Sequence, residues 1–220
     1  MPDSPFSSPD FLGRDHHAVE YSEELAKALT EGVSSDGNDS AGIDPEPLKD
    51  FSADASESVL HFENWASDQR NEHGRLFDST GREVWRGAGE NNRISVPNAQ
   101  PFCTFTHNHP NGTPPSFEDV IAGAVAQQRE LRVVTPSGVA YSIRFEDRTY
   151  GAIGAMVSRI KFLDSASWAV AEEWIRSTGR TIDEKERMCR RFHAIFLQLS
   201  REGFMSYSRS NAGRRTNAGT

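Results

Sequence analysis

Two histidines lie one residue apart in the stretch FTHNHPNGTPPSFED, which covers residues 105–119. Side chains alternate between the two faces of an extended strand, so His107 and His109 point to the same side. Pro110 ends the strand, and a Pro/Gly-rich turn leads to a helix that begins at Ser116 and carries Asp119 in its first turn. Two imidazoles and a carboxylate suit zinc, with the fourth position left to water. The stretch therefore predicts a metal site formed by His107, His109 and Asp119.

The same residues also have a purely structural interpretation. Ser116 followed three residues later by an acid is a capping pattern, in which both side chains satisfy free N–H groups at the start of a helix. Two histidines at a spacing of two are a weak signal when taken alone. The metal site is favoured by a combination of three features. The paired histidines end an apolar strand, a rigid turn follows them, and the helix start brings Asp119 back beside them.

Hydrolysis at a metal also needs a general base that takes a proton from water and delivers it to the leaving group. Three upstream carboxylates are candidates for this role. Glu72 lies where a helix gives way to a strand, and pairing within the same sheet would bring it beside the metal. Glu83 lies in an outer hairpin strand and Glu90 in a polar loop, where a solvated charge is the simpler interpretation. Residue positions alone favour Glu72 modestly and leave the other two open.

The elements that must position these groups follow from the hydrophobic pattern. An amphipathic helix is expected over residues 56–69, followed by a hairpin around the turn DSTG with strands near 73–77 and 82–86. Further strands are expected at 92–97, 101–107, 130–135 and 138–145, with a helix over 116–128. This order predicts an α/β domain over residues 56–148, built around one mixed or largely antiparallel sheet with helices covering it.

Both ends of the chain differ from this central part. Residues 1–55 are rich in Ser, Asp, Gly and Pro and predict a flexible acidic region with one helix at 18–33. Residues 149–205 carry apolar side chains at helical spacing and predict a helical C-terminal extension, in which Gly179 caps a helix. The polar residues 206–220 predict a disordered tail.

Composition narrows the classes of function. The 220 residues are 36% hydrophobic, which allows one domain of ordinary size with a real core. The net charge of -8 opposes non-specific binding to nucleic acid or to an anionic membrane. We expect a cytoplasmic protein, because no apolar run approaches the roughly 20 residues that span a bilayer and no signal-peptide pattern begins the chain. Cys103 and Cys189 belong to no paired motif, so plain thiols are expected.

The motif HNHP followed by SFED, with Glu72 upstream at a helix-to-strand boundary, resembles the Glu, HxHP and SxxD motif of the JAMM metalloproteases, also called the MPN-plus or JAB family. The segment THNHPNGTPPS is especially similar to the corresponding segment of RadC-like proteins and of phage-associated JAB domains. In the phage-associated domains, a hairpin like EHGRLFDSTG is also usual. The resemblance covers about residues 57–145. It implies a JAB/MPN-like, cytidine-deaminase-like α/β fold with a mixed sheet flanked by helices.

The resemblance also implies a role for each motif residue. Glu72 corresponds to the catalytic acid and base, His107, His109 and Asp119 to the zinc ligands, and Ser116 to the residue that stabilises the oxyanion. The implied activity is that of a zinc-dependent peptidase or isopeptidase, acting on a protein, a peptide or a ubiquitin-like conjugate. The intervals between the motif parts are short for the family, which implies a sheet without the insertions that hold ubiquitin in deubiquitinases.

Two other functions fit the same residues. Metal-bound and metal-free versions of this fold serve in assembly, and the helical extension is large enough to present a partner surface, as in a phage or mobile-element scaffold. A DNA-associated role follows by analogy with RadC-like proteins, but the acidic balance opposes it. The five motif residues favour the enzyme, because a scaffold has no need of an acid at Glu72.

Overall fold

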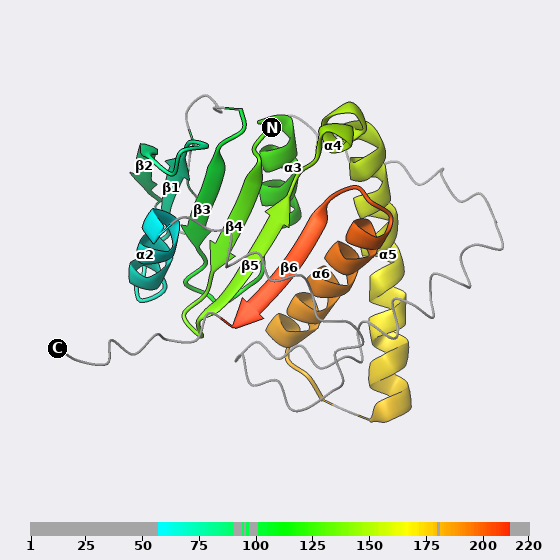
Figure 1. Cartoon of the computed structure of the whole chain (residues 1–220). Coiled ribbons are helices and arrows are strands. Elements are labelled where there is room, and N and C mark those ends of the chain that lie inside the picture. Colours follow the sequence, from blue (N-terminus) through cyan, green and yellow to red (C-terminus); the bar gives the residue numbers. More distant parts are fainter. Residues whose placement is uncertain (1–56, 90–93, 95, 97–100, 180, 212–220) are drawn as a thin grey trace, which may run out of the picture.

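The computed structural model describes residues 57–89, 94, 96, 101–179 and 181–211. They form a six-stranded sheet with helices on both faces, which confirms the predicted mixed α/β class (Figure 1). The strands are β1 (His73–Phe77), β2 (Glu83–Ala88), β3 (Thr104–Asn108), β4 (Glu130–Val134), β5 (Val139–Arg144) and β6 (Ser206–Asn211). The helices are α2 (Glu57–Ala66), α3 (Phe117–Val125), α4 (Asp147–Gly151), α5 (Ile153–Thr178) and α6 (Glu184–Arg201).

Apart from the strand at 92–97, the elements expected between residues 57 and 145 are present with small shifts in their bounds. Of the strand expected at 92–97, only Ile94 and Val96 are described, and neither lies in a strand. The region 1–55 with its expected helix lies outside the described residues. None of the described helices combines the length and apolar character required to cross a bilayer. Both cysteines are buried thiols that form no disulfide within the described residues, as expected.

The sheet has the order β2-β1-β3-β4-β5-β6. Neighbouring strands pair antiparallel except for β3 and β4, which are parallel. A parallel pair needs a crossover connection, and here α3 supplies it. The strand that carries His107 and the helix that carries Asp119 are therefore consecutive parts of one β–α–β unit.

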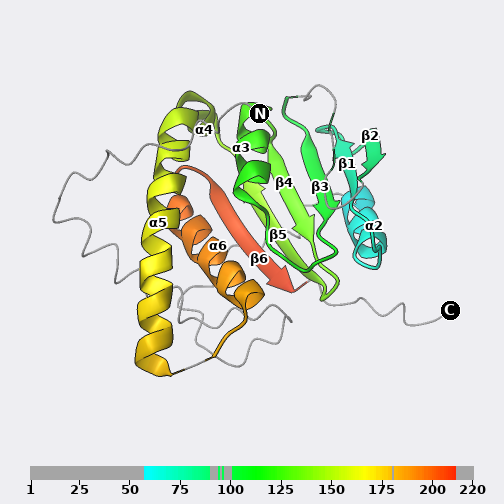
Figure 2. The same cartoon turned by 180° about the vertical axis from the view of Figure 1, so that it is seen from behind.

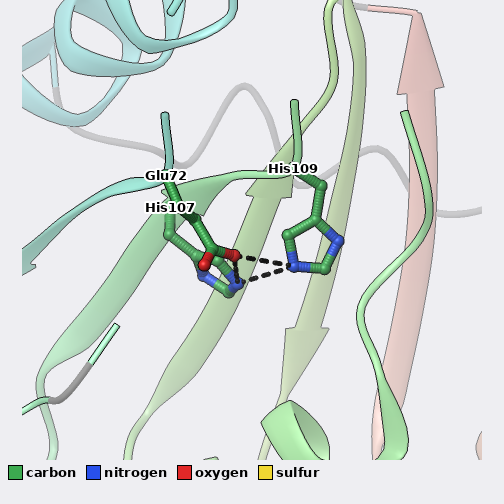
Figure 3. Close-up of side chains that lie close together, drawn as sticks. All are labelled: Glu72, His107 and His109. Atoms are coloured by element: carbon green, nitrogen blue, oxygen red, sulfur yellow. Dashed lines mark hydrogen bonds and ion pairs between the residues drawn. The ribbon is translucent and has the colours of Figure 1, made fainter. Parts of the chain in front are cut away.

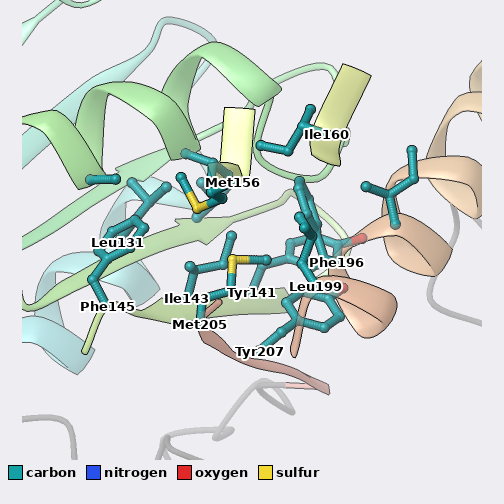
Figure 4. Close-up of a cluster of buried hydrophobic side chains, with 14 of the residues drawn as sticks. Leu131, Tyr141, Ile143, Phe145, Met156, Ile160, Phe196, Leu199, Met205 and Tyr207 are labelled. Carbon is teal, nitrogen blue, oxygen red and sulfur yellow. The ribbon is translucent and has the colours of Figure 1, made fainter. Parts of the chain in front are cut away.

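One face of the sheet is apolar and forms the main core. Paired positions place a row of buried side chains across five strands, and the row consists of Leu76, Phe105, Leu131, Ile143 and Tyr207. Helices α3, α5 and α6 cover this face, as Figure 2 shows. Met156 and Ile160 from α5 and Phe196 and Leu199 from α6 pack into the same cluster (Figure 4). The central domain and the C-terminal helices thus share one hydrophobic core.

The opposite face combines a small apolar cluster beneath α2 with a buried polar network. Glu63 of α2 forms two bonds with the guanidinium of Arg132, from Nε to Oε1 at 2.6 Å and from Nη2 to Oε2 at 3.0 Å. Glu130 accepts a hydrogen bond from Arg132 at 2.9 Å and another from Ser142 at 2.6 Å. Thr106 donates to Glu63 at 2.9 Å. This network ties α2 to β3 and β4, because every charged group in it has a partner of opposite charge.

The C-terminal extension is helical as expected, but its first part is a single long helix. Helix α5 runs without a break through Asp164 and Ser165, where no Gly or Pro interrupts the pattern. Gly179 ends α5 in the left-handed conformation with a φ of 64°, which confirms its predicted role as a cap.

The prediction that residues 206–220 are a disordered tail is wrong for residues 206–211. They form β6, which pairs antiparallel with β5 along its length. Tyr207 enters the apolar core, while Ser206 and Ser208 take the other side of the strand. The segment alternates serines with other residues, of which Tyr207 alone is apolar, so it lacks the alternation of apolar and polar residues that predicts a strand. The pairing with β5 stabilises the strand. Residues 212–220 lie outside the described part of the chain.

Removing the buried guanidinium should destabilise the fold strongly. We expect Arg132→Met to lower the free energy of unfolding by about 3–5 kcal/mol, because Glu63 loses the guanidinium that pairs with it and Glu130 keeps a longer contact, of 3.6 Å, with Arg144. Arg82→Met is the matched control, since Arg82 pairs with Asp78 but its side chain is 80% exposed; its expected loss is below about 1 kcal/mol. Denaturant unfolding measures the free energy of unfolding of both variants. Equal losses would contradict the stabilising role given to the buried Arg132 network.

Candidate metal centre

His107 and His109 lie at the C-terminal end of β3, on the face of the sheet that α3 covers. The backbone N–H of His109 donates to the carbonyl oxygen of Val134 at 2.9 Å. This bond continues the pairing with β4 beyond the last residue of β3, so the alternation of side chains extends to His109. Glu72 lies directly before β1, the antiparallel neighbour of β3. Figure 3 shows its carboxylate directed at the two imidazoles.

Four potential ligand groups converge at this point. The Nε2 atoms of His107 and His109 are 3.1 Å apart, and Oε1 of Glu72 lies 4.0 Å from the first and 3.4 Å from the second. Asp119 places Oδ1 at 3.9 Å from Nε2 of His107 and Oδ2 at 3.5 Å from Nε2 of His109. Ligand atoms around a tetrahedral zinc ion with bonds of about 2.0–2.1 Å are about 3.3 Å apart. The group Glu72, His107 and His109, all buried, can therefore hold a metal ion.

Glu72 stands as near to the histidines as the predicted ligand Asp119 does. We expected Glu72 to lie outside the ligand shell, but its carboxylate reaches the same two Nε2 atoms. The side chain of Glu72 is 6% exposed and that of Asp119 is 27% exposed. The centre thus offers two imidazoles and two carboxylates, of which Glu72 is the more deeply buried.

Asp119 and Ser116 form the predicted helix cap and face the histidines at the same time. Oδ2 of Asp119 accepts from the Ser116 backbone N–H at 2.7 Å and from its hydroxyl at 2.8 Å. The Ser116 Oγ in turn accepts from the Asp119 N–H at 3.0 Å. The capping interpretation is confirmed, and it does not exclude a role at the centre, because the cap holds the Asp119 carboxylate beside both imidazoles.

The loop after β3 fixes the orientation of the His109 ring. Its Nδ1 lies 3.1 Å from the carbonyl oxygen of Thr113 and 3.0 Å from that of Pro114. Because carbonyl oxygens only accept, Nδ1 carries the proton and Nε2 is directed into the centre. Metal-binding histidines commonly have such a partner on the other ring nitrogen. These two carbonyl groups were not among the predicted site groups, and the PP pair is the feature of the loop sequence that points to them.

His107 is held by packing. The residue is 2% exposed, and its ring stacks on Phe105 with centroids 4.8 Å apart and planes 17° from parallel. Its Nδ1 is buried and has no hydrogen-bond partner within the described residues. The Nε2 atoms of the two histidines lie 3.1 Å apart, and a cation between them would satisfy both lone pairs.

Burial and neighbouring charges shift the pKa values at the centre in opposite directions. Burial, with the charge of His109, lowers the pKa of His107 to about 3. Burial would also lower the pKa of His109, but the hydrogen bond and charge of Asp119 and the charge of Glu72 outweigh it, and the pKa is raised. Burial raises the pKa of Glu72. Burial opposes ionisation of Asp119 too, yet the two histidines and Ser116 hold its pKa well below the usual range.

Of the other two candidates for the general base, Glu83 is described and lies away from the centre. Glu83 forms ion pairs with Arg75 and Arg86. Glu90 lies outside the described residues. His73, the residue after Glu72, turns away from the centre by strand alternation and packs edge-on against Trp65. Of the two upstream acids that the structure describes, Glu72 is the one that lies at the histidines.

Comparison of the chain with protein-family models, with curated proteins and with solved structures finds no match in any of the three. The likeness to JAMM proteases therefore depends on the motif residues and their geometry.

Metal content is the first property to measure. We expect near-stoichiometric zinc in the wild-type protein, measured by mass spectrometry after purification and dialysis, and loss of that zinc in His107→Ala/His109→Ala. His61→Ala is the control, because His61 is an exposed histidine of α2 and its removal should leave the metal content unchanged. Equal, near-stoichiometric zinc in all three proteins would mean that the ion binds at a site other than His107 and His109.

Zinc affinity should depend on pH through His109. A metal-bound imidazole nitrogen must be unprotonated. Because the pKa of His109 is raised above 6.5, zinc must displace a proton from His109 when the pH is below that raised pKa. The apparent affinity should rise about ten-fold per pH unit up to this pKa and level off above it. His107 adds no dependence near neutral pH, because its pKa is lowered to about 3. Competition with a chelator measures the profile; a profile without slope in the weakly acidic range would refute this explanation.

Proposed function

We propose that this chain is a zinc-dependent hydrolase of the JAMM type that cleaves a peptide or isopeptide bond. The supporting observation is the convergence of Glu72 and Asp119 on the Nε2 atoms of His107 and His109, all within 4.0 Å. These residues come from three separated motif parts, in the order that the family uses. The same order supports a JAB/MPN-like fold for the sheet, with β6 and the C-terminal helices as additions.

Zinc is the proposed metal because of the donor set. Two imidazole nitrogens with one or two carboxylate oxygens suit zinc better than magnesium or calcium, which prefer oxygen ligands alone. The restrained His109 ring and the buried His107 ring fit a tetrahedral ion, as the distances between their nitrogen atoms indicate. When bound, zinc supplies a Lewis acid that polarises a carbonyl group and lowers the pKa of water toward about 7.

Glu72 is the proposed general base and acid. Its carboxylate is buried beside the histidines, and burial raises its pKa. A raised pKa brings the group closer to neutral pH, where it can take a proton from the attacking water and then give that proton to the leaving amine. The low exposure of Glu72 keeps bulk water from competing for the proton.

Ser116 and Asp119 are proposed to act as a pair. Asp119 completes the ligand set from the first turn of α3, and Ser116 holds the Asp119 carboxylate through two donated hydrogen bonds. For Ser116 to stabilise an oxyanion, as the resemblance implies, its hydroxyl proton must turn from Asp119 to the substrate oxygen. The proposed substrate is a protein, a peptide or a ubiquitin-like conjugate.

An assembly function remains the competing proposal. An assembly module would gain nothing from a buried carboxylate whose contacts are two imidazoles, because burying such a group costs free energy. The deep burial of Glu72 thus supports the hydrolase over a scaffold.

Changes at the motif residues should separate their roles. With a peptide or ubiquitin-like conjugate that the wild-type protein cleaves, we expect Glu72→Gln to lower kcat by about 10²–10⁴-fold when assayed at saturating zinc. Ser116→Ala should retain measurable activity, with a loss of about 10²–10³-fold. Glu83→Gln is the control and should cleave like the wild type, since Glu83 pairs with two arginines on β1 and β2. Full activity in zinc-loaded Glu72→Gln would remove Glu72 from the mechanism.

A further inference from the structure

Asn108 separates the two histidines, and its side chain points to the opposite face of the sheet. Because side chains alternate along a strand, Asn108 turns toward the α2 side while His107 and His109 turn toward the candidate metal centre. The residue is 1% exposed. It lies where the pairing of β1 with β3 ends, one residue beyond the last paired position, Gly74 with His107.

The Asn108 amide uses its oxygen and its nitrogen within one short segment, residues 69–73. Oδ1 accepts from the backbone N–H of His73 at 2.7 Å. Nδ2 donates to the carbonyl oxygens of Asn71 at 3.1 Å and Gln69 at 3.4 Å. These partners define the orientation of the amide, because an N–H group can only donate and a carbonyl oxygen can only accept.

These hydrogen bonds lie on both sides of Glu72. Residues 71 and 73 are both bound to Asn108, and the carbonyl oxygen of Glu72 itself accepts from the Gly89 N–H at 2.7 Å. The backbone that carries Glu72 is therefore restrained before, at and after this residue. That backbone fixes the point and the direction from which the Glu72 side chain leaves the main chain, and so the region that its carboxylate can reach.

We propose that Asn108 is a positioning residue that sets the Glu72 carboxylate against the histidine pair. Strand β3 then supplies both imidazoles on one face and, from its other face, holds the segment that carries the acid. The histidines have separate restraints, since His109 is held by Val134 and Thr113. Loss of the Asn108 amide should thus displace Glu72 and leave the imidazoles in place. The consequence for catalysis rests on the proposed function, but the positioning itself does not.

Amide hydrogen exchange tests the positioning in the metal-free protein. In Asn108→Ala we expect the amides of His73 and Gly89 to exchange at least about 10-fold faster than in the wild type, because the segment loses its restraint. Asn108→Thr keeps strand propensity and serves if the alanine variant does not fold. Thr106→Val is the matched control: Thr106 lies on the same strand and face, is 0% exposed and donates to Glu63. In Thr106→Val, the amides of His73 and Gly89 should exchange as fast as in the wild type.

Zinc affinity then tests whether Asn108 acts through Glu72. We expect Asn108→Ala to weaken zinc binding by about 10–100-fold, measured by chelator competition. In a Glu72→Ala background, the same change should add less than about 3-fold, because the group that it positions is already absent. Thr106→Val should bind zinc as the wild type does.

The outcomes separate this inference from the proposed function. If the wild-type protein binds zinc but the Asn108 variants match Thr106→Val in exchange and affinity, the positioning role is overturned and the metal site stands. Additive losses in the double variant would also overturn it, since Asn108 would then act independently of Glu72. If the wild type binds no zinc while exchange at His73 and Gly89 responds to Asn108, the hydrolase proposal fails and the positioning role stands.

Discussion

The register between β1 and β3 determines the geometry of the candidate metal centre. Gly74 lies opposite His107, and this pairing places Glu72 beside the end of β3. A shift of one residue would turn the side chains of a strand to the other face. The glycine is required by packing, because a Cβ on Gly74 would lie 2.9 Å from the ring of Phe105. Without that Cβ, Phe105 can lie against β1 and stack on His107.

The two faces of the sheet bury charge in different ways. On the α2 side, Glu63 and Glu130 share the guanidinium of Arg132, so the buried charges are compensated within the protein. On the other side, the carboxylates of Glu72 and Asp119 face imidazoles, one of which has its pKa lowered to about 3. A buried carboxylate beside a half-buried one is costly without a positive partner. A divalent cation would supply the charge that the imidazoles supply only in part.

The C-terminal helices support the centre through α3. Phe117, in the first turn of α3, packs against Phe192 of α6 with ring centroids 4.3 Å apart. The same turn carries Asp119 and is capped by Ser116. Helices α5 and α6 and strand β6 also complete the core beneath the sheet. The segment after residue 148 is therefore part of the structure that positions the candidate site, in addition to any surface that it presents to a partner.

Local features of this protein were determined by its sequence. The shared direction of His107 and His109 follows from strand alternation, and the Ser116–Asp119 cap follows from a spacing of three at a helix start. The tertiary structure decided what depends on non-local pairing. It selected Glu72 over Glu83, gave Asn108 its three backbone partners, and made a strand of the polar residues 206–211. Such choices depend on which strands lie side by side, and no pattern within a single segment contains that information.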